Sequence, residues 1–324
     1  MTSSKTAQRI VITGASSGIG AATAIAFARR GARLVLAARG KAGLGDIAEQ
    51  CRAAGGEARV EVVDVTDAAA VARLAARARD DLGGIDIWFS NVGVGVVGKY
   101  QDVPIADHAQ VIAANLIGHM NDAHAVLPIF LAQDHGIFIN MISVGGFIAT
   151  PYAAAYSASK FGLRGFSEAL RGEVSKHPRI HICDVYPTFV DTPGIDHAGN
   201  YTGAALSLPP GALSPDTVAK AVVRLADHPR NTTAVGAPAI ALKLNQFFVP
   251  NLGAAMMNGF MDHWSKKADP SVDGTGALHD PPPAPSGVDG GRRRPDQRRK
   301  AAAAGAGVAV LGLAALGAMR WRRR

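Results

Sequence analysis

The sequence has little cysteine and few aromatic residues, and each shortage excludes a class of protein. Its two cysteines, Cys51 and Cys183, lie far apart and form no CxxC pair, so the sequence indicates neither a disulfide framework nor a zinc site. Aromatic residues make up only 6% of the chain, which argues against a protein that stacks single-stranded nucleic acid on aromatic rings. The ten histidines are scattered without an HExxH motif, so we expect no metal site.

Most of the chain also lacks a strong net charge. The total of +8 is concentrated from Arg292 to Arg324, where ten Lys or Arg and one acid, Asp296, give +9. The residues before Arg292 therefore sum to about −1. Because the basic residues bracket an apolar stretch, we expect no nucleic-acid partner, and binding of nucleic acid by this tail remains a weaker alternative.

Short apolar runs alternate with longer Ala-rich stretches through most of the chain. Helix formers fill the intervening stretches, among them 21–30, 68–81 and 161–176. Runs that are apolar at successive positions are typical of strands buried on both faces. The alternation predicts an α/β fold, a doubly wound parallel sheet of Rossmann type, in one domain over residues 7–268. The expected strands are 9–13, 33–38, 59–65, 85–90, 136–142, 181–186 and 232–237.

The composition changes after Lys267. Residues 269–300 are rich in Pro, Gly and Arg and predict a disordered, unpacked linker. Residues 301–319 are uncharged, and a helix of that length would span roughly 28 Å, close to a bilayer core. We therefore expect a transmembrane or membrane-associated helix, followed by a basic end at 320–324; the alternative is a disordered or surface-lying tail. The start MTSSKTAQRIVITG indicates no signal peptide, so we expect a cytoplasmic domain anchored by its C-terminus.

A glycine-rich turn, TGASSGIG from Thr13 to Gly20, follows the first expected strand and precedes a helix. Gly14 permits a tight turn, Gly18 lets the backbone approach a pyrophosphate, and Gly20 lets the helix pack close to the sheet. The helix N-terminus would then face the phosphates. The turn predicts a dinucleotide site.

The stretch YSASK places Tyr156 and Lys160 four residues apart. In a helix they would lie one turn apart on the same face, where the ammonium would favour the ionised phenol. A phenol with a pKa near 10 is otherwise a poor base at neutral pH. The pair is compatible with proton transfer but is not specific by itself.

Several motifs in order resemble the short-chain dehydrogenase/reductase family in its compact single-domain form. The turn has TGxxxGxG spacing, and Tyr156 follows Ser143 by thirteen residues. The other matches are Asp64 after the third strand, Asn115 in a helix, Pro187 after the sixth strand, and Thr192. The resemblance covers residues 7–268 and implies an oxidoreductase with a nicotinamide cofactor.

The resemblance also implies roles for individual residues. Tyr156 would exchange a proton with the substrate oxygen, Ser143 would orient that oxygen, and Lys160 would hold the nicotinamide ribose and lower the pKa of Tyr156. Asn115 would hold a water that links Lys160 to solvent. The expected cofactor-binding residues are Gly14, Ser16, Ser17, Gly18, Ile19, Gly20, Arg39, Asp64, Val65, Asn91, Tyr156, Lys160, Pro187, Val190 and Thr192.

The end of the second strand indicates which cofactor is used. Enzymes that use NAD commonly carry an acid there, whereas this chain has Ala38 followed by Arg39. A guanidinium suits a phosphate, so we expect NADP(H) rather than NAD(H). The chain departs from the family pattern at Val92, in SNVG, and at Thr188, which follows Pro187; both could alter cofactor affinity.

The apolar loops suggest the substrate class. The segment 188–214 is long and mixes apolar side chains with Gly and Pro, and it would form an apolar pocket with 92–100 and 145–152. We expect an NADP(H)-dependent oxidoreductase that interconverts an alcohol and a carbonyl on a small, lipophilic substrate. The alternative is a non-catalytic nucleotide-sensing or scaffold protein on the same fold. A homo-oligomer is an expectation from the resemblance alone.

Overall fold

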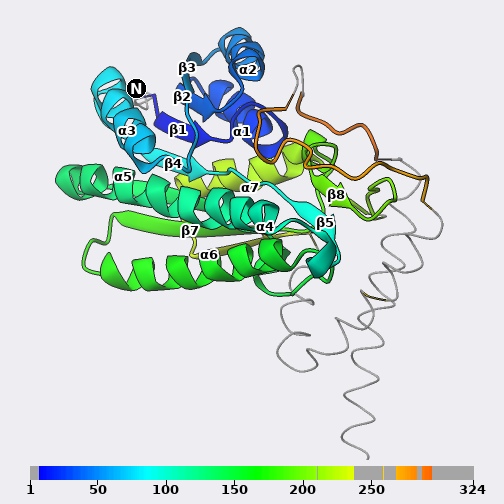
Figure 1. Ribbon diagram of the computed structural model, residues 1–324. Helices are drawn as coiled ribbons and strands as arrows, with labels where there is room; N and C mark the ends of the chain where they lie inside the picture. The colour runs from blue at the N-terminus through cyan, green and yellow to red at the C-terminus, as the bar shows by residue number, and fades with distance from the viewer. Residues whose placement is uncertain (1–6, 210, 237–257, 259–267, 283–286, 294–324) are drawn as a thin grey trace, which may run out of the picture.

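A seven-stranded parallel sheet forms the centre of the domain (Figure 1). The structure, a computed structural model, describes residues 7–209, 211–236, 258, 268–282 and 287–293. The strand order is β3-β2-β1-β4-β6-β7-β9, and β5 and β8 form a separate parallel pair. The strands are β1 (Arg9–Thr13), β2 (Arg33–Ala38), β3 (Glu57–Val62), β4 (Ile87–Ser90), β5 (Val96–Gly98), β6 (Gly136–Met141), β7 (Ile180–Pro187), β8 (Gly199–Tyr201) and β9 (Thr232–Val235).

Helices cover both faces of this sheet, and successive strand residues divide between them. Ile12 belongs to a buried cluster with Phe27 of α1, whereas Val11 belongs to another with Leu74 of α3 and Phe130 of α5. Burial on both faces explains why the strands are apolar at successive positions. The helices are α1 (Gly18–Ala28), α2 (Lys41–Ala53), α3 (Ala68–Leu82), α4 (Ile105–Ile112), α5 (Gly118–Gln133), α6 (Ala154–Glu173) and α7 (Pro215–Asp227).

The predicted α/β fold with a parallel Rossmann-type sheet is confirmed. Strands β1 and β2 have the predicted bounds, and the other strands of the main sheet differ by a few residues at their ends. The largest shift is in α6, which begins at Ala154 rather than 161 and therefore contains Tyr156. The β5–β8 pair was not predicted, because its strands are three residues long and rich in Gly.

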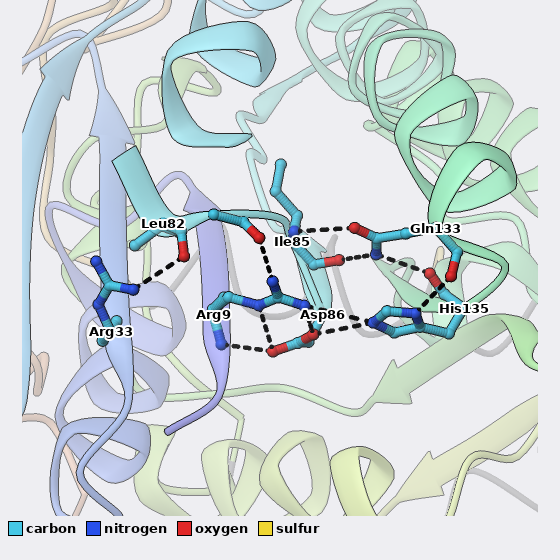
Figure 2. A network of polar contacts seen from close by, with 8 residues as sticks. Arg9, Arg33, Leu82, Ile85, Asp86, Gln133 and His135 are labelled. Atoms are coloured by element: carbon cyan, nitrogen blue, oxygen red, sulfur yellow. Dashed lines mark hydrogen bonds and ion pairs between the residues drawn. The ribbon is translucent and has the colours of Figure 1, made fainter. Parts of the chain in front are cut away.

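An ion-pair network ties together the amino ends of β1, β4 and β6 (Figure 2). Asp86 accepts hydrogen bonds from the backbone N–H of Arg9 (2.8 Å) and from its Nε (3.1 Å), and its Oδ1 lies 3.2 Å from Nε2 of His135. Burial acts to raise the pKa of Asp86, but the bonds from Arg9 outweigh it and hold that pKa below its ordinary value. The network lies at the sheet edge opposite the carboxyl ends of the strands.

A C-terminal segment packs against the domain; residues 268–282 and 287–293 are called the strap below (Figure 1, orange). Gly274 pairs with Asn200 of β8 in an antiparallel bridge, and the backbone N–H of Ala277 donates to His197 O (2.8 Å). The Leu278 side chain is buried. Over the described part of 269–300, these contacts differ from the expected unpacked linker, because backbone hydrogen bonds and one apolar side chain hold the segment in place; 283–286 and 294–300 lie outside the described residues.

The expected apolar helix at 301–319 and the basic end at 320–324 lie outside the described residues. Among the helices that the structure does describe, none has the length and apolar character needed to cross a membrane. The tail therefore stays a prediction.

Candidate functional site

The glycine-rich turn joins β1 to α1 at the carboxyl edge of the sheet. Gly14 has φ +67°, which favours glycine, and a Cβ on Gly20 would lie 2.1 Å from the Gly14 carbonyl oxygen. Asn91, directly after β4, donates from Nδ2 to that same oxygen (3.1 Å). The turn is therefore held tightly, and α1 begins at Gly18, so the N-terminus of a helix lies at this turn, as a pyrophosphate site requires.

Other expected cofactor residues surround this turn. A Cβ on Gly18 would lie 3.1 Å from Cβ of Thr192, so the loop after β7 reaches the start of α1. Val190 in that loop forms a bridge with Leu213. Ser16, Ser17 and Ile19 are partly buried in the turn, and Pro187 ends β7.

Tyr156 and Ser143 meet where β6 gives way to α6. Ser143 has φ +119°, a conformation rare for a residue with a side chain, and its Oγ accepts from the backbone N–H of Gly145 (3.1 Å). The two side chains are neighbours: a Cβ on Gly145 would lie 3.0 Å from Cε1 of Tyr156 and 3.6 Å from Oγ of Ser143, and Ser143 acts to lower the pKa of the phenol. Backbone strain of this kind is concentrated at functional sites, and here it accompanies a hydroxyl and a phenol placed side by side.

Lys160 lies one turn after Tyr156 on α6 and is almost fully buried. Its Nζ donates to the Met141 carbonyl oxygen (3.1 Å) and lies 5.7 Å from the Tyr156 ring centroid. Burial lowers the pKa of Lys160 to about 7. Burial also raises the pKa of Tyr156, and Ser143 acts in the opposite direction. This differs from the expectation that Lys160 lowers the pKa of Tyr156: desolvation dominates for both groups.

Asn115 lies in a π-helical turn, Ala113–Ile117, between α4 and α5. Its Oδ1 accepts from the backbone N–H of Val94 (2.8 Å), and its Nδ2 donates to Val94 O (2.9 Å) and to Ser159 Oγ (3.3 Å). The amide thus fastens the loop after β4 to α6. Local π-helical geometry is frequent at functional sites, because it re-aims one side chain within a helix.

Arg39 and Asp64 follow β2 and β3 at the same sheet edge. Nη1 and Nη2 of Arg39 donate to backbone carbonyl oxygens of the strap at 2.7 to 3.2 Å. Asp64 accepts from the backbone N–H (2.9 Å) and hydroxyl (2.8 Å) of Thr66. The Val65 carbonyl oxygen accepts from Asn121 Nδ2 (2.8 Å).

A buried polar layer beneath the site was not predicted. His119 Nε2 lies 2.7 Å from the Val92 carbonyl oxygen, and its Nδ1 contacts Asn140 Oδ1. Burial, then the nearby Lys160 charge, lowers the pKa of His119 to about 4. Asp122 accepts from the hydroxyls of Thr13 and Ser90, each at 2.7 Å, and burial raises its pKa to about 6. The signal available in the sequence was the presence of two polar residues, His119 and Asp122, three positions apart within an apolar helix.

The two departures from the family pattern are accommodated by ordinary contacts. The Val92 side chain packs against the buried cluster that includes α3 and α5. The backbone N–H of Thr188 donates to Val235 O of β9 (3.2 Å). Within the residues that the structure places, no group of three or more His, Cys, Asp or Glu side chains could hold a metal ion.

Comparisons with known proteins identify a family and similar oxidoreductases. The family model for short chain dehydrogenase matches residues 8–200. The chain is similar to an uncharacterized oxidoreductase, YxnA, of Bacillus subtilis, with 30% identity over 267 residues, 82% of this chain and 75% of the relative.

Two solved structures are similar as well. An alcohol dehydrogenase from the archaeon Thermococcus sibiricus complexed with 5-hydroxy-NADP has a TM-score of 0.62 and 27% identity, covering 71% of this chain and 95% of that one. A metagenomic short-chain oxidoreductase in complex with NADP has a TM-score of 0.61 and 31% identity, covering 70% of this chain and 96% of that one.

Proposed function

The chain belongs to the short chain dehydrogenase family of NAD(P)-dependent oxidoreductases, and we propose that it interconverts an alcohol and a carbonyl with NADP(H). The observation that carries this proposal is the placement of Tyr156, Ser143 and Lys160 at the same sheet edge as the glycine-rich turn. A proton donor, an oxygen-binding hydroxyl and a dinucleotide cradle together suit carbonyl reduction or its reverse.

The mechanism assigns each of these side chains one task. A bound nicotinamide cofactor would supply or accept the hydride. Tyr156 gives a proton to the substrate oxygen during reduction, or takes it during oxidation, and the Ser143 hydroxyl donates a hydrogen bond to that oxygen. Lys160, buried with its pKa near 7, can relay a proton at neutral pH. Asn115 would serve this relay by holding the loop after β4 against α6.

The preference for NADP(H) rests on Arg39. β2 ends at Ala38, so no carboxylate follows the strand to repel a 2′-phosphate, and the Arg39 guanidinium lies next in the chain. Both solved structures described above were determined with NADP or 5-hydroxy-NADP. Gly14, Gly18 and Gly20, with Asn91 and Thr192, would hold the pyrophosphate and the nicotinamide end.

The substrate is proposed to be lipophilic. Tyr156 packs at the edge of a buried apolar cluster with Val96, Val111 and Ala155, and Phe147 lies in a neighbouring cluster. An apolar carbonyl compound would gain from such surroundings. A membrane tether at 301–319 would suit the same substrate class, and membrane flotation of the full chain beside one ending at Arg293 tests it.

The decisive experiment removes one hydroxyl. In the full chain, Tyr156→Phe should reduce NADPH-dependent turnover of a panel of lipophilic aldehydes and ketones by roughly 10²- to 10⁴-fold, because the proton donor is lost. NADPH affinity should stay within a few-fold of wild type. Ser175→Ala is the control, since it removes an exposed hydroxyl at the far end of α6 from Tyr156, and it should keep full activity.

The same experiment separates the enzyme from a nucleotide-sensing scaffold. A scaffold would bind NADPH and turn over no carbonyl in either variant or wild type. Equal turnover by Tyr156→Phe and wild type would contradict the assignment of the proton donor.

A further inference from the structure

The strap passes over several backbone and side-chain donors that the proposed function assigns to the cofactor. Its first part is clipped to the loop after β7: Gly274 and Asn200 exchange two backbone hydrogen bonds (2.8 and 2.9 Å), and Ser271 N–H donates to Gly203 O (3.0 Å). Its last part is clipped to the same loop, since the backbone N–H groups of Arg292 and Arg293 donate to the buried Asp191 carboxylate (2.9 and 2.8 Å). Between these clips, residues 277–280 and 287 contact Arg39 and Gly18 at the carboxyl edge of the sheet.

The strap occupies Arg39. Nη1 donates to the carbonyl oxygens of Leu278 (3.1 Å) and His279 (2.8 Å), and Nη2 to those of Ala277 (2.7 Å) and Asp280 (3.2 Å). Within the described part of the chain Arg39 makes no ion pair. Neutral carbonyls thus take the place that a phosphate would fill, and a phosphate is the stronger partner for a guanidinium.

The strap also occupies the glycine-rich turn. The backbone N–H of Gly18, the first residue of α1, donates to the Gly287 carbonyl oxygen (3.1 Å). That N–H belongs to the helix terminus that would bind the pyrophosphate. One segment therefore engages both anion-binding groups of the proposed cofactor site.

An apolar anchor, Leu278, holds the part of the strap that binds Arg39. Leu278 is 1% exposed and belongs to the buried cluster with Val96, Val103 and Val111, against which Tyr156 packs. Gln110 Nε2 also donates to the Leu278 carbonyl oxygen (3.4 Å). The apolar anchor of the strap therefore lies in the same cluster as Tyr156, the proposed proton donor.

We propose that the strap is an autoinhibitory segment that competes with NADP(H) for Arg39 and for the N-terminus of α1. This inference rests on the proposed use of NADP(H). Cofactor binding exchanges the strap carbonyls for phosphate oxygens and releases residues 277–282 and 287, while the clip at Gly274 stays closed. Dinucleotide affinity is reduced by the fraction of molecules in which the strap is docked.

The test uses a matched pair of glycines in the full chain. A Cβ on Gly276 would lie 2.5 Å from His197 O and 2.6 Å from Ala198 O, and its φ is +56°, so Gly276→Ala should dislodge the strap. Gly274 has no atom within 4 Å of its own would-be Cβ, so Gly274→Ala is the control. In a second pair, Leu278→Glu puts a charge into the buried cluster and should also dislodge the strap. Its control is Val272→Glu, because the Val272 side chain is 92% exposed.

Two readouts are compared, NADPH affinity by fluorescence titration and amide hydrogen exchange. Gly276→Ala and Leu278→Glu should bind NADPH about tenfold more tightly than wild type and the controls, the change expected for a strap docked in about nine of ten molecules. In wild type, NADPH or adenosine 2′,5′-bisphosphate should speed exchange at the Ala277 N–H, which donates to His197 O. The Gly274 N–H should keep its protection.

The outcomes distinguish this inference from the proposed function. Equal NADPH affinity in all variants overturns the strap as a competitor and leaves the cofactor assignment standing. Weaker binding in Gly276→Ala, with more protection at Ala277 on adding NADPH, also overturns it, since the strap would then be a clasp over the bound cofactor. Absence of NADPH binding even where exchange shows the strap released overturns the cofactor assignment and this inference with it.

Discussion

At the scale of single residues, burial in the site disfavours the charged forms of Tyr156 and Lys160. Lys160 loses hydration and gains one hydrogen bond, to the Met141 carbonyl oxygen, so its pKa falls to about 7. Between that value and the ordinary 10.5, the unfolded chain binds a proton that the folded chain does not. Stability therefore rises with pH across this window and is lowest at and below its acid end.

The first prediction follows from the free-energy cost of burying the Lys160 amine. Lys160→Met should abolish turnover and raise the free energy of unfolding at pH 7 by about 1–3 kcal/mol, because an apolar side chain of similar length replaces a buried amine. The gain should shrink as the pH approaches 10.5, measured by urea unfolding at several pH values. Lys176→Met, at an exposed position, should change neither activity nor stability. A Lys160→Met protein less stable than wild type at pH 7 would contradict this account.

At the scale of elements, the β1–α1 turn is the part on which the site most depends. Gly20→Ala would place a Cβ 2.1 Å from the Gly14 carbonyl oxygen and 2.8 Å from Asn91 Nδ2. We expect a loss of about 1–3 kcal/mol in unfolding free energy, since the backbone must move to relieve the overlap. NADPH affinity should fall with it, because the same turn carries the helix terminus. Thermal unfolding and NADPH titration measure the two effects.

The control for this change is a helical glycine in open space. Gly45 in α2 has no atom within 4 Å of its would-be Cβ, so Gly45→Ala should be neutral or stabilising by up to about 1 kcal/mol. If Gly20→Ala behaves as Gly45→Ala does, the tight approach in the turn is not what holds the site.

The sequence was most informative about secondary-structure elements and the turns between them. Apolar runs such as RIVIT predict buried strands because both faces of a parallel sheet are covered, and the TGxxxGxG spacing places the turn. The fold follows from these local patterns, the pairing of Tyr156 with Lys160 from helix spacing, and the grouping of Ser143 with them from the family resemblance. The pKa of Tyr156 did not follow from the sequence, since desolvation depends on neighbours distant in the chain. Nor did the docking of the strap, whose Pro- and Gly-rich composition hides backbone hydrogen bonds to Arg39 and Asn200.

At the scale of the whole molecule, the two edges of the sheet have different tasks. The carboxyl edge carries the candidate site, and the amino edge is held by Asp86, which binds Arg9 and His135 across three strands. Changes at the amino edge should therefore alter stability and leave cofactor binding as it is.

Arg9→Ala tests this division. Removal of the guanidinium leaves the Asp86 carboxylate with only the backbone N–H of residue 9 and the His135 ring as partners, and we expect the unfolding free energy to fall by about 1.5–3 kcal/mol at pH 7. Because Arg9 holds the pKa of Asp86 below its ordinary 3.8, its contribution is complete above that pH and is lost as the pH falls through the folded-state pKa. The variant and wild type should thus converge in stability in acid, followed by urea unfolding from pH 7 downward. Arg29→Ala, at an exposed position of the same part of the fold, should match wild type throughout. NADPH affinity should be the same in all three proteins, and a loss in Arg9→Ala alone would mean that the amino edge transmits strain through the sheet to the site.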